Sequence, residues 1–558
     1  MIHSDEIKQS IKKILVFTLF LTTIAITPWM TIDPINLVKL TTLSAGAFGI
    51  GSLLLIAAKK AFFLKHCWAS LLSLLLVFQL FLVLLFSESS LSSQFFGTMG
   101  RNTGLLCYVS LMLVLTGSIF VSETEAYKAI IKVAIIVGGI SGIYGGLQYL
   151  GADPINWANK YSPVIGFLGN PNFQSSLLGL GAIASIVLTL DPATKQWLRV
   201  ISVATVFISL AVAAVSHSQQ GLLVFAIGIA VLGYFKVKHL GKNVVTGVYI
   251  SGLFATTFVT VLGFLNKGFL SSFLYQPSVT YRGDYWRAGW NMALHNPLFG
   301  VGLDSYGDNY RKYRTLEATL RRGPEVVSNA AHNVFIDFAA NGGMPLLLIY
   351  IAFLGLAIQK IHRYARNGSR DHFFEGVVAV WVGFMAQSVI SINQIGLAVW
   401  GWVLTGLIIG WESKVSNSQD LQVAKKVHKS KNFEQASNPK NFLVLLVGLV
   451  IGLSISLPPL VASAREKTAM ASTQLEKILQ AERAWPQDPT RSNQIASILV
   501  SNSLNREALK IARTTTKRFP DNFEAWKVLS QIPSVPESEK AKALNEMKIL
   551  DPLNPSLK

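Results

Sequence analysis

Polar residues that could carry chemistry gather in four short parts of an otherwise apolar sequence. They are residues 97–104, 166–173, 216–221, and the two ends of a long polar segment, 281–287 and 331–335. Polar side chains are costly in a lipid environment, so their positions in such a chain are informative. These four clusters are where the sequence predicts a functional site.

Arginine and histidine give the clusters their chemistry. Arg101, Arg282 and Arg287 carry guanidinium groups, which bind phosphate oxygens in bidentate fashion. Helix N-termini beginning at the clusters would add backbone donors for the same anion. His332 carries an imidazole that could take or guide the proton of an attacking hydroxyl. The combination predicts a site for a phosphorylated lipid.

Each cluster also has a structural interpretation. The stretch 169–172 has the residues of a turn and a helix cap. The stretch 216–221 could be a polar loop between helices. Arg101 and Arg287 could anchor the chain by pairing with lipid headgroups, and His332 could be a hydrogen-bonded core histidine.

The segments between the clusters predict an all-α polytopic membrane bundle. The 558 residues are 51% hydrophobic and 14% charged, against about 25% charged residues in globular domains. Apolar runs of roughly 20 residues, the length of a spanning helix, recur along the chain. We expect twelve to thirteen spans, the short eighth being the least marked. They lie near 14–30, 37–58, 67–86, 104–121, 129–150, 173–190, 197–215, 221–235, 243–265, 344–360, 373–391, 395–411 and 441–460.

The basic residues predict the orientation. Lys and Arg concentrate in alternate loops, whereas the short loops of the other side carry only Arg101 and Lys160. Because basic residues stay in the cytoplasm, the N-terminus is expected there and the C-terminus outside. The net charge of +19 is explained in the same way, and we expect no nucleic-acid partner. All four polar clusters then lie on the outer side.

The predicted organisation has four parts. Residues 1–411 form a membrane domain with a long extracytoplasmic loop, 266–343. Residues 412–440 form a polar, Lys-rich cytoplasmic linker, and 441–460 the last span. Residues 461–558 form a soluble extracytoplasmic helical domain.

The C-terminal domain contains a repeated pattern. Pro486, Pro520 and Pro552 are spaced by 34 and 32 residues, with helical periodicity between them. This spacing resembles tetratricopeptide repeats, which usually offer a docking surface for a protein partner. The alternative is a plain helical hairpin. His, Cys and acidic residues are not spaced as metal ligands, so we expect no metal and no cofactor.

Six short motifs follow one another along most of residues 30–400. They are Gly100-Arg101-x-x-Gly104, Tyr144-Gly145-x-x-Gln148-Tyr149, Gly169-Asn170-Pro171-Asn172, Arg282-x-x-x-Trp286, Pro297-Leu298-Phe299-Gly300-Val301-Gly302, and His332-Asn333 before Gly342-Gly343. In this order they resemble the O-antigen ligase and polymerase superfamily. Many relatives also have an arginine in the turn before the span near 221. Here that turn contains Gln219 instead, so either His217 or another arginine would supply the charge, or the donor is held differently.

The resemblance implies a glycosyltransferase of the bacterial inner membrane that uses an undecaprenyl-pyrophosphate-linked glycan as donor. Arg282 would hold the pyrophosphate and His332 would position or deprotonate the acceptor hydroxyl, with inversion and without a metal. The substrate-binding residues implied are Arg101, Arg287, Asn170, Asn172, His217, Gln219 and Asn333.

The acceptor distinguishes the alternatives. A ligase would transfer to lipid A core, a polymerase to another lipid-linked repeat unit, and a protein O-oligosaccharyltransferase to Ser or Thr. Two alternatives from other classes are a lipid-linked oligosaccharide flippase and a non-catalytic scaffold. A flippase would place its polar residues near the bilayer midplane, and a scaffold leaves the Arg282 and His332 motifs unexplained.

Overall fold

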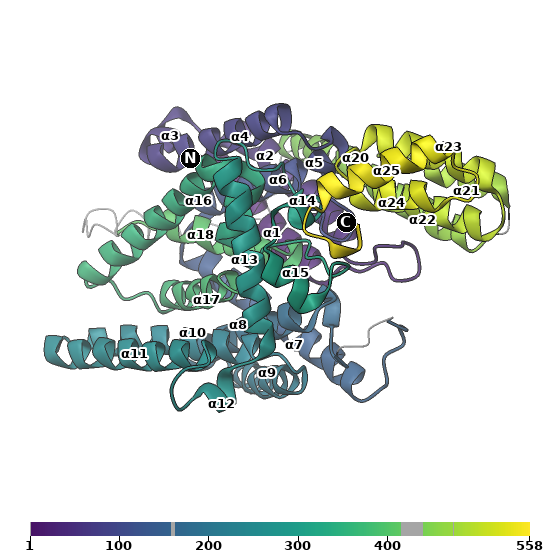
Figure 1. Cartoon of the computed structure of the whole chain (residues 1–558). Helices are drawn as coiled ribbons and strands as arrows, with labels where there is room; N and C mark the ends of the chain where they lie inside the picture. Colours follow the sequence, from purple (N-terminus) through teal and green to yellow (C-terminus); the bar gives the residue numbers. More distant parts are fainter. Residues whose placement is uncertain (1, 158–161, 414–438, 473, 558) are drawn as a thin grey trace.

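The chain is a bundle of helices with a second helical unit at its C-terminal end (Figure 1). The computed structural model describes residues 2–157, 162–413, 439–472 and 474–557, and these contain helices and no strand. The predicted all-α polytopic fold is therefore confirmed. The bundle helices are α1 (Ile2–Ile24), α2 (Asn36–Ala57), α3 (Lys60–Lys65), α4 (Cys67–Phe86), α5 (Leu91–Phe96), α6 (Leu105–Val121), α7 (Thr124–Tyr149), η1 (Gly166–Leu168), α8 (Pro171–Leu190), α9 (Gln196–Val215), α10 (Gln220–His239), α11 (Asn243–Phe264), α12 (Ser271–Leu274), α13 (Pro277–His295), α14 (Tyr306–Tyr313), α15 (Leu316–Arg322), α16 (Val334–Arg366), α17 (His372–Ser388), α18 (Ile395–Ile409) and α20 (Pro439–Met470).

A helix lies at each of the thirteen predicted spans. Among the described residues, nine helices are long and apolar enough to cross a membrane, and α6 and α18 are shorter apolar helices. Helices α1 and α17 belong to neither group. α1 begins at Ile2, well before the predicted 14–30, and ends at Ile24, a few residues before Pro28, whose ring restricts the preceding backbone.

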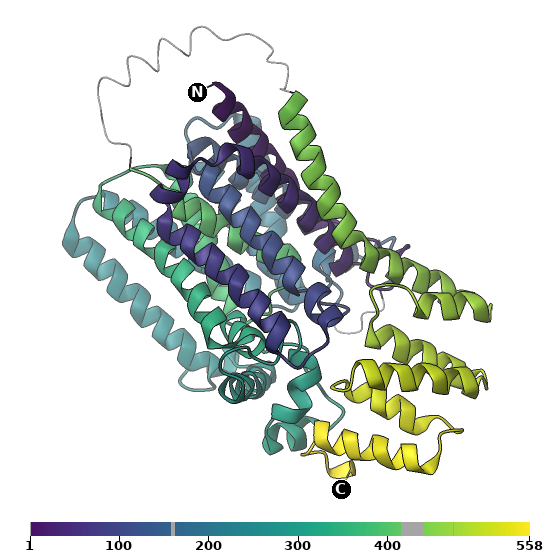
Figure 2. The ribbon, with the colours of Figure 1, turned by 90° about the horizontal axis from the view of Figure 1, so that it is seen from above.

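Different elements lie at the two ends of the bundle. The N-terminus lies at one end, while α13, α14, α15 and the C-terminal helices lie at the other (Figure 2). We call the latter the loop end. At the opposite end, Lys8 pairs with Glu123 and Lys65 with Glu412.

Local sequence rules explain many helix starts. For example, the Asp371 carboxylate accepts hydrogen bonds from two backbone amides at the start of α17.

Helices α18 and α8 lie in the core of the bundle. Every residue of α18 is buried, and α8 is enclosed by α7, α9, α10 and α17. α11 is exposed along most of its length, as expected for a helix that faces lipid. α20 packs along α2, where the Thr41 hydroxyl donates to the Ser456 carbonyl.

A kink in α16 joins two of the sequence motifs. Gly343 has φ +76° inside this helix, a left-handed conformation that favours glycine. A Cβ there would lie 2.5 Å from the Leu298 backbone. The Val301 amide donates to Ala340 and the Met344 amide to Pro297. The motif at 297–302 therefore packs directly against the kink at 342–343.

The C-terminal unit consists of α21 (Leu475–Glu482), α22 (Pro489–Ser501), α23 (Asn505–Arg518), α24 (Phe523–Gln531), α25 (Glu537–Leu550) and η2 (Pro555–Leu557). α22 packs on α23 and α24 on α25, around an apolar core that includes Leu499, Ile511 and Trp526. The domain boundaries and the tetratricopeptide assignment stay predictions. Most of the predicted linker, 412–440, lies outside the described residues.

Candidate active site

A pocket at the loop end brings together three of the four polar clusters. Its volume is about 230 Å³, smaller than the ~300–1,000 Å³ of pockets that enclose whole drug-sized ligands. It is lined by the start of α8, the α9–α10 turn, the ends of α11 and α12, the start of α13 and Ile390. None of these lining residues is acidic. The pocket suits a compact anionic group, such as the phosphates of a larger substrate.

Arg282 provides the cation of this pocket. Its Nε donates to the Ile390 carbonyl at 3.0 Å, and Nη1 to the Ser278 hydroxyl at 3.3 Å. No acidic side chain neutralises it within the described part of the chain. Burial lowers the pKa of Arg282. The positive charge of its guanidinium is therefore held in the pocket without a compensating negative charge from the protein. An anion bound beside Arg282 would supply that compensation.

The N-termini of α8 and α10 meet at the same pocket. Asn170 is the N-cap of α8, where its side-chain oxygen accepts from the Asn172 amide. The Asn172 oxygen in turn accepts from the Ser218 hydroxyl at 2.8 Å. His217 and Gln219 lie in the turn before α10, and both line the pocket together with Asn172. Two helix N-termini directed at one site favour an anion there.

His332 lies in the turn immediately before α16, half-buried and with φ +54°. Its ring stacks on Tyr285 of α13, with centroids 5.1 Å apart. The Trp286 indole faces the His332 carbonyl at 3.5 Å. Burial first, and then the charges of Arg282, Arg101 and Arg322, lower the pKa of His332 to about 3. At neutral pH the imidazole is therefore uncharged.

Arg322 is a cation beside His332 that sequence analysis did not single out. Its guanidinium lies over the Tyr281 ring, 4.4 Å from the centroid, and donates to the Tyr285 hydroxyl. The neighbouring Arg321 pairs with Asp284 at 2.5 Å. No local motif marks Arg322, because only folding brings α15 onto α13.

Arg101 is buried in an ion pair. Its Nε donates to Asp304 at 2.8 Å, and Nη1 donates to the Asn329 carbonyl at 2.7 Å. The same carboxylate accepts from Thr103 and from the Thr98 amide. Arg101 is 5% exposed, so it joins the first cluster to the chain that leads to His332 rather than lining the pocket.

Like Arg101, the predicted residues Asn170, His332, Arg287 and Asn333 are not among those that line the pocket. Arg287 is exposed on α13, on a different side of the helix from Arg282. Asn333 is 7% exposed and is the N-cap of α16, accepting from Phe335 and Ile336 amides. Within the described residues no group of three His, Cys, Asp or Glu side chains could hold a metal ion, so we assign no ligands.

Comparison with known proteins finds a family similarity over part of this site. No curated protein and no solved structure matches the chain. Residues 204–351 match the model of the O-antigen ligase family. The matched region contains His217, Gln219, Arg282, Arg287 and His332, but not Arg101, Asn170 or Asn172. Over this region the chain is similar to the O-antigen ligase family, which supports, at a general level, a membrane enzyme that transfers glycans.

Proposed function

We propose that this protein transfers a glycan from an undecaprenyl-pyrophosphate carrier to an acceptor hydroxyl at the loop end, which is the extracytoplasmic side. The observation that carries the proposal is an Arg282 that no acidic side chain neutralises, in a pocket without acidic lining residues and close enough to His332 for its charge to lower the pKa of the imidazole. The match to the O-antigen ligase family supports it over residues 204–351.

The donor pyrophosphate would bind beside Arg282. Asn172, His217 and Gln219 line the same pocket, and the N-termini of α8 and α10 add partial positive charge. As the glycosidic bond breaks, its electron pair leaves with the pyrophosphate. Arg282 stabilises that developing charge, a type of interaction worth about 10²–10³ in rate.

The acceptor hydroxyl would be activated by His332. The hydroxyl oxygen attacks the anomeric carbon from the side opposite the pyrophosphate, and its proton moves to the neutral imidazole. A single displacement of this kind inverts the anomeric carbon. Three arginines disfavour a charged His332 in the free protein, so a bound pyrophosphate assists the proton transfer by offsetting their charge. The imidazole becomes a stronger base only when the donor is present.

The other predicted residues would support these two. Arg101 positions the His332 segment through Asn329. Asn170 and Asn333 hold the first turns of α8 and α16. Arg287, exposed on α13, would contact the glycan beyond the reacting sugar.

The acceptor would be another lipid-linked repeat unit or lipid A core, as in a polymerase or ligase. Protein O-glycosylation is the alternative within the same chemistry. The test is to incubate the purified protein with an undecaprenyl-pyrophosphate glycan and each of the three acceptors, then to analyse products by mass spectrometry. Transfer to one acceptor, lost in His332→Ala, is the expected result. Donor movement across proteoliposomes without transfer would instead indicate a flippase.

A further inference from the structure

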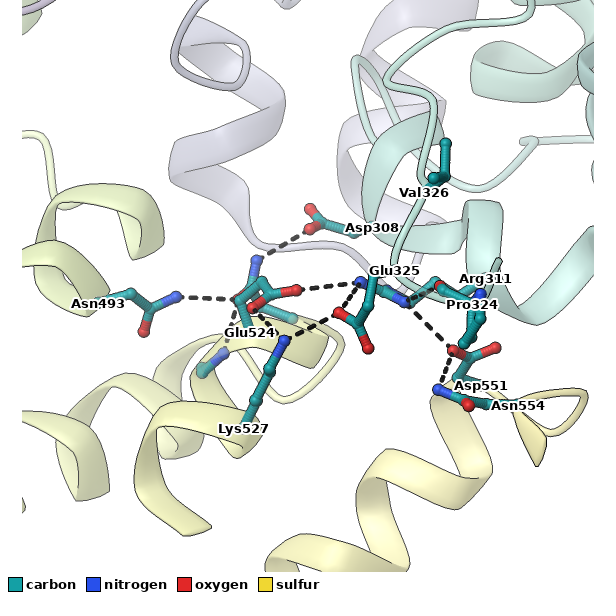
Figure 3. A network of polar contacts seen from close by, with 12 residues as sticks. Asp308, Arg311, Pro324, Glu325, Val326, Asn493, Glu524, Lys527, Asp551 and Asn554 are labelled. Carbon is teal, nitrogen blue, oxygen red and sulfur yellow. Dashed lines mark hydrogen bonds and ion pairs between the residues drawn. The ribbon is translucent and has the colours of Figure 1, made fainter. Parts of the chain in front are cut away.

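The C-terminal helices contact the segment that leads to His332. Asp551 follows α25, and its carboxylate accepts two hydrogen bonds from Arg314 Nη2, at 2.7 and 2.8 Å. Arg311 Nη1 donates to the same carboxylate at 3.3 Å. The Asp551 and Arg314 side chains are 0% and 1% exposed. Figure 3 shows Asp551 beside Arg311, joined to it by a dashed line, with Pro324 next to them.

The two arginines also hold the backbone of the His332 segment. The Pro324 carbonyl accepts from Arg311 at 2.6 Å and from Arg314 at 2.9 Å, and the Val326 carbonyl accepts from Arg314 at 3.3 Å. Arg314 and Arg311 are thus bridges, with the C-terminal carboxylate on one side and residues 324–326 on the other.

The same segment is fixed at its other end by the membrane domain. Arg101 donates to the Asn329 carbonyl, and the Ala331 amide donates to Asp337. His332 follows at once, in a left-handed conformation that a non-glycine residue keeps only when its surroundings fix it. The geometry of His332 therefore depends on both anchors of the segment.

Further contacts surround the Asp551 pair. The Arg311 guanidinium lies 4.2 Å from the centre of the Phe523 ring, and the Asn522 amide donates to Asp308 at 2.9 Å. Lys527 pairs with Glu325 at 2.9 Å. Residues 522–527 and 551 form one face, and this face is covered by the chain's own loop. On this face the C-terminal unit already has its partner.

We propose that the C-terminal unit is an intramolecular latch that positions His332, and that Asp551 is the positioning residue at its centre. Because the latch acts through backbone carbonyls, its loss would move His332 without removing any group that touches substrate. The expected effect of the latch on glycan transfer rests on the proposed function. Its expected effect on the structure of the segment before His332 does not depend on the reaction.

The test compares Asp551→Asn with the matched control Glu539→Gln in the full-length protein in detergent. Glu539 also pairs with an arginine, Arg513, at 2.6 Å, but both lie within the C-terminal unit and are partly exposed. Hydrogen exchange of residues 323–331 is expected to accelerate about tenfold or more in Asp551→Asn and to stay unchanged in Glu539→Gln. Glycan transfer is expected to lose about tenfold in kcat with little change in the donor KM.

Asp551→Glu is the second variant, for the case that Asp551→Asn does not fold. It keeps the charge but displaces it by one methylene, and an intermediate acceleration of exchange is expected. Unchanged exchange of residues 323–331 in the folded Asp551 variants would overturn the latch, whatever the protein catalyses. Accelerated exchange together with a wild type that transfers no glycan to any acceptor would uphold the latch and refute the proposed function.

Discussion

The His332 imidazole stacks on the Tyr285 ring, with the ring centres 5.1 Å apart and an interplanar angle of 29°. The Arg322 guanidinium lies 5.7 Å from the centre of the same Tyr285 ring and donates to the Tyr285 hydroxyl. Tyr285 itself is fixed because the Tyr306 hydroxyl donates to its carbonyl at 2.7 Å. Tyr285 thus contacts both the imidazole and a cation whose charge acts on that imidazole.

Removing the Arg322 charge is expected to raise the pKa of His332. Burial is the main cause of the low pKa, and Arg322 adds to it, so Arg322→Met should move the value toward, but not up to, the ordinary 6.5. The acid limb of the kcat/KM profile reports this pKa in the free enzyme. The control is Lys312→Met, an exposed cation of the same loop that lies over Tyr313. An equal shift in both variants, or none in Arg322→Met, would contradict the arrangement.

Replacing His332 is expected to abolish transfer while the protein still folds. General-base catalysis contributes about 10²–10⁴ in rate, and His332→Gln should lose at least that much. Because the pKa is near 3, kcat/KM should show no histidine titration between pH 7 and pH 5. The acid limb of the kcat profile should lie at higher pH than that of the kcat/KM profile, because a bound pyrophosphate offsets the charge of the surrounding arginines. A histidine-like fall of kcat/KM near pH 6.5 would exclude this environment.

The low pKa of His332 also makes the stability of the folded protein depend on pH. The folded pKa of His332 lies below the unfolded value of 6.5, so between pH 6.5 and about 3 the unfolded chain binds more protons. Stability is expected to decrease as pH falls through this range. His332→Gln should flatten that part of the profile in thermal unfolding at pH 7, 6 and 5, whereas a profile unchanged by the substitution would mean that His332 titrates normally when folded.

Much of this site followed from composition and local motifs, because spans and polar clusters are local properties of a sequence. The start of α8 was visible in the capping sequence that contains Asn170, whereas Asn333, predicted to bind substrate, proved to cap α16. The partners of the arginines were not visible. Arg101 meets a carboxylate 203 residues away and Arg314 one 237 residues away. No spacing rule links such distant residues, so the pairing of Asp304 with Arg101 and the places of Arg322 and Asp551 emerged only from the fold.

Breaking the Arg101–Asp304 pair is expected to destabilise the loop end. Both side chains are almost fully buried, at 4% and 0% exposure, and removing one partner of such a pair costs about 3–5 kcal/mol. Arg101→Met and Asp304→Asn should each lower the thermal unfolding midpoint, and the double variant should lose less than the sum of the two. Additive losses would show that the pair is not coupled.

We expect Arg282 to act through the fixed planar geometry of its guanidinium donors as well as through its charge. Arg282→Ala should lower kcat by about 10²–10³, and Arg282→Lys should recover only part of the loss because an ammonium binds phosphate as a point charge. Arg287→Ala, on the exposed side of the same helix, should cost less than about tenfold. Full recovery by Arg282→Lys, or an equal loss in Arg287→Ala, would contradict the assignment of the pyrophosphate to Arg282.

The orientation of the bundle can be tested independently of the chemistry. Lys312 is exposed at the loop end, and Lys195 is exposed at the opposite end, before α9. In a background with Cys67 and Cys107 replaced, a membrane-impermeant maleimide should label Lys312→Cys in intact cells. It should label Lys195→Cys only after the membrane is permeabilised, when both sites react. Basic loops remain in the cytoplasm, and Lys195 belongs to them whereas the His332 site does not. The reverse labelling pattern would put Arg282 and His332 in the cytoplasm, where an extracytoplasmic transfer of a glycan is impossible.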